Sequence, residues 1–258
     1  MNWFVVGAVV ALVLAGVMLY LSRDARARHR KMYLTETTTT GTLRSLQEAA
    51  ASAAGAGAFQ QQVELAGKAV AGPGGLLTSE MSKTSCVWHH HRVTRKYRKV
   101  SHDSKGNRQT STAEEVVTEN VTHDSFLLRD AEGDITLVPG DEVDGARKAL
   151  SEFREGDRDR VELFGFSFAG NNDGDTLGYE YEEWVLAPDT AIFVQGEVSD
   201  RDGTLRVTEP EEKGDFVIST RSEAALLKKA DHAARLYGWL AVAAGALALV
   251  LLVVGFVR

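Results

Sequence analysis

The sequence predicts a mainly β protein, a sandwich or barrel-like domain flanked by an N-terminal and a C-terminal transmembrane helix. The only long runs without a charged residue lie at the two ends, over residues 3–21 and 236–257. At about 1.5 Å per residue, each run spans about 30 Å as a helix, which matches the hydrocarbon core of a bilayer. Between them, short β-branched and aromatic segments alternate with turn residues, a pattern typical of sandwiches and barrels.

The composition of the chain limits its function. The 258 residues carry a net charge of −7, which argues against a nucleic-acid partner. The single cysteine, Cys86, excludes an intramolecular disulfide. It also excludes a zinc module of the RING or ribbon type within this sequence, because such modules use four Cys or His ligands for each metal ion.

The charges around the two apolar runs predict a retained anchor and an orientation. A cleaved signal peptide requires a basic residue before its apolar stretch, and none precedes the first run. Basic residues instead follow the first run and precede the second: Arg23, Arg26, Arg28, Arg30, Lys31, Lys228, Lys229 and Arg235. Only Arg258 follows the second run. We therefore expect an integral protein with two spans, residues 22–235 in the cytoplasm and both termini outside, in the plasma membrane.

The segment 22–62 is expected to form a basic juxtamembrane connection and a short helix. Residues 42–54 are good helix formers, and Thr42 is a suitable N-cap. The Ala- and Gly-rich stretch 49–58 leaves a flexible linker as an alternative for the second half of this helix.

Residues 63–220 are expected to form the β-rich domain. A period of two and turn residues predict strands at 63–72, 86–100, 114–122, 126–139 (a hairpin), 161–168, 178–186, 191–198, 203–207 and 216–219. Residues 145–153 are interpreted as one or two helical turns. The last element, 221–257, is predicted as one continuous helix that ends in the span 236–257, because a Thr220–Glu223 capping box opens a run without Gly or Pro up to Gly238.

Three consecutive histidines, His89 to His91, are the strongest hint of a metal site. Neighbouring residues of a strand point to opposite faces, so only His89 and His91 share a side. Two histidines need further ligands that the sequence does not identify, and we interpret them as part of a polar strand face. No metal and no cofactor is expected.

Basic residues cluster in the predicted hairpin around residue 100. Those that we expect to face lipid are Arg92, Arg95, Lys96, Arg98 and Lys99. Each basic residue near an anionic surface contributes about 1 kcal/mol of attraction. The alternative is a solvated hairpin whose charge is balanced by neighbouring acids, among them Glu119.

No catalytic residue is assigned. The segment around Ser167 lacks the second glycine of a nucleophile elbow, and Cys86 is expected to be a buried, inert thiol. Glu180, Glu182 and Glu183 are expected on an exposed strand edge. A membrane-anchored hydrolase that uses Ser167 or Cys86 remains an alternative.

An ordered set of segments resembles the GIDE, or beside-a-membrane, domain of the MULAN/MAPL mitochondrial E3 ubiquitin ligases. The segments are LRSLQEA (43–49), SCVWHHHRV (85–93), FLLRDAEGDITLVP (126–139), GYEYEEWVLAPDTAIFVQGEV (178–198) and GDFVISTRSEAALLKKADHAARLYGW (214–239). The resemblance implies a β-rich domain between two spans that binds membrane lipids or an unidentified protein partner.

The ligases of that family carry a RING after the second span, and residues after 239 of this sequence offer no zinc ligands. We therefore expect a membrane-proximal interaction module rather than an enzyme. The alternative is an E3 ubiquitin transferase-like protein that needs a RING from another subunit. The sequence does not predict an oligomeric state.

Overall fold

A computed structural model describes residues 3–34, 37–102, 106–155, 161–163, 166–168, 175–212, 214–221 and 223–257. The chain divides into two compact units. One contains α1 (Trp3–Leu34) and α3 (Glu223–Val257), and the other is the β unit, Thr37–Arg221.

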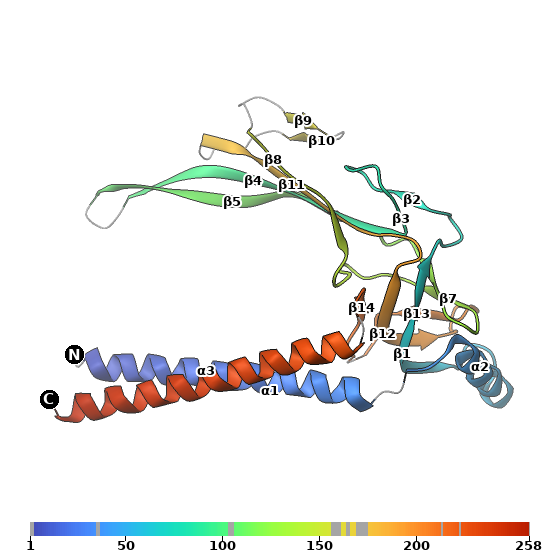
Figure 1. Cartoon of the computed structure of the whole chain (residues 1–258), viewed down its shortest axis with the longest axis horizontal. Helices are drawn as coiled ribbons and strands as arrows, with labels where there is room; N and C mark the ends of the chain where they lie inside the picture. The colour runs from blue at the N-terminus through green and yellow to red at the C-terminus, as the bar shows by residue number, and fades with distance from the viewer. Residues whose placement is uncertain are drawn as a thin grey trace. The chain divides into compact units, whose positions relative to one another are not determined.

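The helical unit is a pair of long helices that lie side by side and antiparallel (Figure 1). Small residues allow a close approach: a Cβ on Gly7 would lie 3.4 Å from Leu251 Cδ1, and Ala11 and Ala248 are buried. The continuous C-terminal helix expected from the sequence is confirmed. Within the described residues, neither helix has the combination of length and apolar character that identifies a membrane span.

A closed five-stranded barrel forms the centre of the β unit. Its strands are β1 (Gln60–Val70), β6 (Phe126–Arg129), β7 (Asp134–Leu137), β13 (Arg206–Thr208) and β12 (Ala191–Ser199), in that order, and β12 pairs back onto β1. All neighbours are antiparallel except β7 and β13. A short strand, β14 (Val217–Ser219), also pairs with β12. The mainly β, barrel-like fold class is therefore confirmed.

Apolar residues of alternating strand positions fill the barrel. The fully buried members include Val63, Leu65, Leu128, Leu137, Val194, Val198 and Val207. Helix α2 (Thr40–Ala54) adds Leu43 to this core. Its N-cap is Thr39 and not Thr42: the hydroxyl of Thr39 accepts a hydrogen bond from the Thr42 N–H at 3.2 Å. The helix thus begins two residues earlier than predicted, within a run of threonines that all suit a cap.

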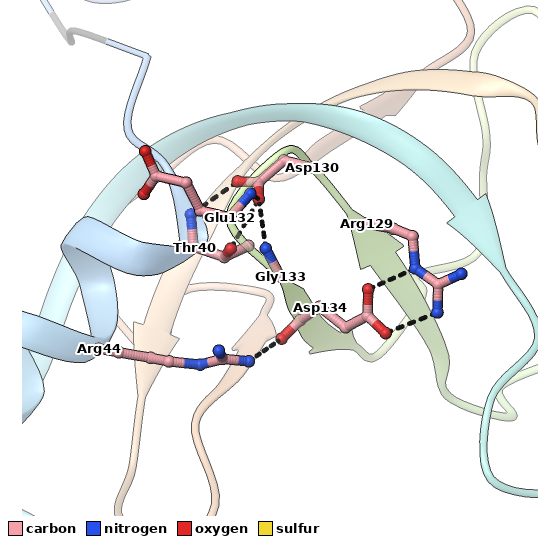
Figure 2. A network of polar contacts seen from close by, with 7 residues as sticks. All are labelled: Thr40, Arg44, Arg129, Asp130, Glu132, Gly133 and Asp134. Atoms are coloured by element: carbon pink, nitrogen blue, oxygen red, sulfur yellow. Dashed lines mark hydrogen bonds and ion pairs between the residues drawn. The ribbon is translucent and has the colours of Figure 1, made fainter.

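Asp130, in the turn between β6 and β7, fixes the start of α2 to the barrel (Figure 2). Its carboxylate accepts hydrogen bonds from the Thr40 N–H and hydroxyl, both at 2.7 Å, and from the N–H groups of Glu132 (2.8 Å) and Gly133 (3.0 Å). Beside this turn, Arg44 of α2 donates a hydrogen bond to the backbone carbonyl of Asp134, the first residue of β7, at 2.9 Å. The hairpin predicted at 126–139 is confirmed, and its turn contains Gly133 at φ 154°.

A second, four-stranded antiparallel sheet is built entirely from insertions into the barrel (Figure 1). Its order is β5-β4-β11-β8, where β4 is Trp88–His102, β5 is Arg108–Val121, β8 is Arg147–Glu155 and β11 is Asp175–Leu186. The strands β4 and β5 lie between β1 and β6 in the chain, whereas β8 and β11 lie between β7 and β12. Two smaller hairpins accompany it: β2 (Leu77–Thr78) with β3 (Ser85–Cys86), and β9 (Val161–Leu163) with β10 (Phe166–Phe168).

Two local expectations were wrong. Residues 145–153 contain no helical turn, because 147–155 form β8, whose backbone hydrogen bonds are supplied by β11. Tertiary pairing therefore overrides the helix propensity of this segment. The acids of 180–183 do not lie on a sheet edge, because β11 runs between β4 and β8, and the Glu183 side chain is fully buried.

Candidate functional site

The paired strands β4 and β11 place two groups of polar residues on opposite faces of one ladder. Their register sets His91 opposite Glu183 and His90 opposite Trp184. Because side chains alternate along a strand, the first pair points to one face and the second pair to the other. The two faces therefore form two separate sites.

The first group, which we call the buried trio, consists of His89, His91 and Glu183. All three are buried, at 7%, 0% and 0% exposure, and each offers a ligand atom within 4.8 Å of the other two. The prediction that His89 and His91 share a face is confirmed. No local sequence pattern identified Glu183 as the third member, because it lies on a strand about 90 residues further along the chain.

Hydrogen bonds from the β2–β3 turn hold the Glu183 carboxylate. Its oxygens accept from the N–H groups of Met81 and Ser82, both at 2.8 Å, and from the Ser79 hydroxyl at 3.0 Å. Burial alone raises the pKa of Glu183, but these hydrogen bonds outweigh burial and hold the pKa below its ordinary value. The interior therefore contains an ionised carboxylate.

Burial favours the neutral forms of the two histidines and of the nearby thiol. Burial lowers the pKa of His89 and of His91 below the ordinary value, despite the acids nearby. Burial, aided by the charge of Glu183, raises the pKa of the Cys86 thiol to about 11. Cys86 is fully buried, in agreement with the expected buried thiol.

The opposite face forms an aromatic site around Trp184, which we call the Trp184 pocket. The ring of His90 stacks on Trp184 with a centroid separation of 5.1 Å and an interplanar angle of 25°. The Lys148 ammonium lies 5.0 Å and the Arg92 guanidinium 5.9 Å from the centroid of the Trp184 ring. Both distances fall within the range of cation–π interactions.

Acidic residues hold these cations in place. Glu119 of β5 accepts a hydrogen bond from Arg92 Nε at 3.0 Å and lies 2.9 Å from His90 Nε2. The hydrogen bond from Arg92 contributes most to holding the pKa of Glu119 below its ordinary value. Lys148 donates to Glu182 at 2.5 Å. Both cations beside the Trp184 ring are therefore paired with acidic side chains.

A cavity of about 460 Å³ lies against this aromatic face. Its other wall is the connection between β7 and β8. The described lining residues are Trp88, His90, Arg92, Glu119, Asp141, Glu142, Val143, Gly145, Ala146 and Trp184. No local sequence pattern predicted this wall, because the connection reaches Trp184 only through the folding of the barrel.

The five basic residues expected to face lipid lie in different environments. Arg95 is 3% exposed and donates to the Thr176 hydroxyl at 2.9 Å, and Arg92 belongs to the Trp184 pocket. Lys96 is paired with Glu180 at 2.8 Å. Arg98 and Lys99 are exposed. Contact of these residues with lipid stays a prediction.

Ser167, considered above as a nucleophile, lies on β10, and its side chain is outside the described residues. The candidate chemistry of the described part of the β unit is therefore that of the buried trio and the Trp184 pocket.

Comparison with known proteins identifies one family. The GIDE family, described as E3 ubiquitin ligase, matches residues 95–255. This span contains Lys148, Glu183 and Trp184 and begins after His91. No curated protein and no solved structure shows a significant match. Because the match covers more than half of its residues, the chain belongs to the GIDE family.

Proposed function

We propose that this GIDE-family chain is a binding module that recognises a protein partner close to a membrane, through the Trp184 pocket. The observation that carries the proposal is the half-buried Trp184 ring with preset cations, in a cavity of about 460 Å³. Tryptophan and arginine in a well-packed pocket are the residues most often responsible for affinity at protein interfaces.

The chemistry of the pocket favours binding over catalysis. None of the described residues that line it carries a hydroxyl or a thiol. Arg92 and His90 are already held by Glu119. A site of this kind supplies an aromatic floor and fixed charges for recognition, without a nucleophile for a covalent step.

Membrane anchoring is supported by the sequence of the two apolar runs and by the exposed side chains of the helical unit. Large apolar residues cover its described surface: Trp3, Val9, Val10, Leu12, Val13, Leu14, Val17, Leu236, Trp239, Leu240, Val242, Leu247, Leu249, Val250 and Val253 are exposed. A surface of this kind is covered by lipid or protein in stable molecules.

Aromatic residues at the ends of the runs also favour a bilayer. Trp3 and Tyr20 lie near the two ends of the first run, and Trp239 lies near the start of the second. All three are more than 70% exposed. Such positions are those of the aromatic belts at membrane–water interfaces.

Site-specific photo-crosslinking tests the binding proposal. A benzophenone amino acid replaces Glu142, an exposed residue at the pocket wall, in the full chain in its native membranes. We expect a protein adduct of defined mass that is lost when the same chain carries Trp184→Ala. Arg98→Ala, on an exposed stretch of β4, is the matched control and leaves the adduct intact. An unchanged adduct in the Trp184→Ala chain would contradict the proposal.

Extraction of native membranes with alkaline carbonate tests the anchoring. We expect the full chain to remain in the membrane pellet, as integral proteins do. Release of the chain into the supernatant, together with a peripheral marker protein, would show that the helices do not anchor it.

The family description favours a second candidate, a role in ubiquitin transfer. These 258 residues contain one cysteine, too few for a RING, so transfer would need a RING from outside this sequence. A transfer assay with the purified chain, with and without a chelator, tests this candidate. Chelator-sensitive transfer by the chain alone would overturn the proposal of a non-catalytic module.

A further inference from the structure

We propose that His89, His91 and Glu183 form a binding site for a divalent transition-metal ion of the Zn²⁺ class. The site lies on the face of the β4–β11 ladder opposite to the Trp184 pocket. The proposal therefore does not depend on the proposed function.

The distances fit a metal after a small movement of side chains. The three ligand atoms lie within 4.8 Å of one another. Ligands at about 2.0–2.1 Å from a tetrahedral zinc ion are about 3.4 Å apart. Closing the difference needs movements of about 1 Å, which rotation of the histidine and glutamate side chains provides. Adjacent, paired strands carry all three residues, so the backbone needs no rearrangement.

The donor set is that of zinc. Two imidazoles and one carboxylate bind Zn²⁺ in many proteins, with a fourth position for water or another ligand. Glu80 offers a further carboxylate, whose Oε2 lies 3.7 Å from His91 Nδ1. Hydrogen bonds from Ser79, Met81 and Ser82 orient the Glu183 carboxylate, as outer partners of metal ligands commonly do.

Two independent observations indicate that a cation belongs here. Among the described residues, His89 Nδ1 is buried without a hydrogen-bond partner, although such atoms are normally satisfied. Within the same part of the chain, no lysine or arginine pairs with Glu183, although its carboxylate is fully buried and held only by hydrogen bonds. A divalent ion would satisfy the unpartnered nitrogen and neutralise the buried charge together.

Metal titration of the purified full chain in detergent tests the proposal. After treatment with a chelator, Zn²⁺ or Co²⁺ is added and binding is measured by calorimetry. We expect one ion per chain, a visible Co²⁺ spectrum of a tetrahedral site, and a melting temperature that rises with metal concentration. Binding that is absent, or that shows no defined stoichiometry, would overturn the proposal.

Variants on the two faces of β4 provide the matched control. We expect His89→Asn and His91→Asn to weaken metal binding at least about 100-fold. His90→Asn, between them but on the opposite face, should bind as the parent chain does. An equal loss of metal affinity in His90→Asn would overturn the assignment, since it would show that binding does not depend on the face of β4 that carries His89 and His91.

X-ray absorption at the zinc edge keeps the test valid if the His89 and His91 variants do not fold. The parent chain loaded with one equivalent of Zn²⁺ should show two imidazole ligands and oxygen ligands only. A spectrum without imidazole scattering would exclude the buried trio as the site.

Discussion

Replacing Asp130 by asparagine tests whether one carboxylate connects α2 to the barrel. Asparagine keeps the oxygen that accepts from the Thr40 hydroxyl, Glu132 N–H and Gly133 N–H. It places an amide NH₂ where the second oxygen accepts from the Thr40 N–H at 2.7 Å. Loss of this helix-terminal bond costs about 1 kcal/mol, and loss of the negative charge at the helix N-terminus adds about 0.5–1 kcal/mol. We therefore expect Asp130→Asn to lower the free energy of unfolding by about 2 kcal/mol.

The effect should depend on pH in a defined direction. Burial alone raises the pKa of Asp130, but the hydrogen bonds from Thr40, Glu132 and Gly133 prevail, and the pKa lies below the ordinary value of 3.8. A carboxylate with a lowered pKa stabilises the fold at pH values above its ordinary pKa, and this contribution is lost as the pH falls through the folded pKa. The stability difference between parent and Asp130→Asn should thus be complete at pH 7 and shrink below about pH 4.

Urea unfolding of the full chain in detergent, followed by circular dichroism of the β signal, measures this difference. Asp134→Asn, at the first residue of β7 beside this turn, is the control, because its ion pair with Arg129 is largely at the surface and is worth less than about 1 kcal/mol. A loss below 0.5 kcal/mol in Asp130→Asn, or a loss equal to that of the control, would refute the reasoning on the helix-terminal bond. So would a difference that stays constant down to pH 3.

Two further substitutions and one measurement of thiol reactivity have defined expected outcomes. Gly67→Ala should lower the stability by about 2 kcal/mol in a thermal melt, because its Cβ would lie 2.5 Å from the Arg129 carbonyl oxygen, whereas Gly74→Ala, in open space, should not. Glu183→Gln should lower the free energy of unfolding at pH 7, measured in urea, by about 3 kcal/mol, because the new NH₂ group would face the Ser82 N–H. Because the pKa of Glu183 is lowered in the folded chain, this difference from the parent should shrink in acid. Cys86, fully buried with a pKa of about 11, should react with maleimide at pH 8 at least about 100-fold more slowly in the folded chain than in urea; equal rates would contradict its burial.

The parts of the fold that depend on local signals were predictable from the sequence. A period of two and the Glu-Gly turn located the 126–139 hairpin, and the absence of Gly and Pro before Gly238 located α3. Pairings between distant segments were not predictable. Barrel closure joins residues 60–68 to 191–199, and no local pattern specifies that partner.

The residues of the candidate sites were likewise predictable only where local patterns determine their positions. The alternation rule placed His89 and His91 on one face, because that rule needs only neighbouring residues. Glu183 was interpreted as exposed because its environment is made by β4, β8 and the turn that contains Ser82. Its burial follows from long-range strand pairing, and so does the approach of residues 141–146 to Trp184.

The barrel and the second sheet differ in the kind of residues that they contain. The barrel closes through β1 and β12 around an apolar core, whereas the polar residues of both candidate sites belong to the second sheet and its connections. The polar residues of both sites lie on the insertions, where β4 of the insertion between β1 and β6 pairs with β11 of the insertion between β7 and β12. A rigid scaffold with sites on its connections is the common arrangement of functional proteins. Glu183 and Trp184 are consecutive on β11, so hydrogen bonds that fix Glu183 also fix the backbone that presents Trp184. The buried trio thereby supports the strand that presents Trp184, and a metal ion bound there would stiffen this strand from the opposite face.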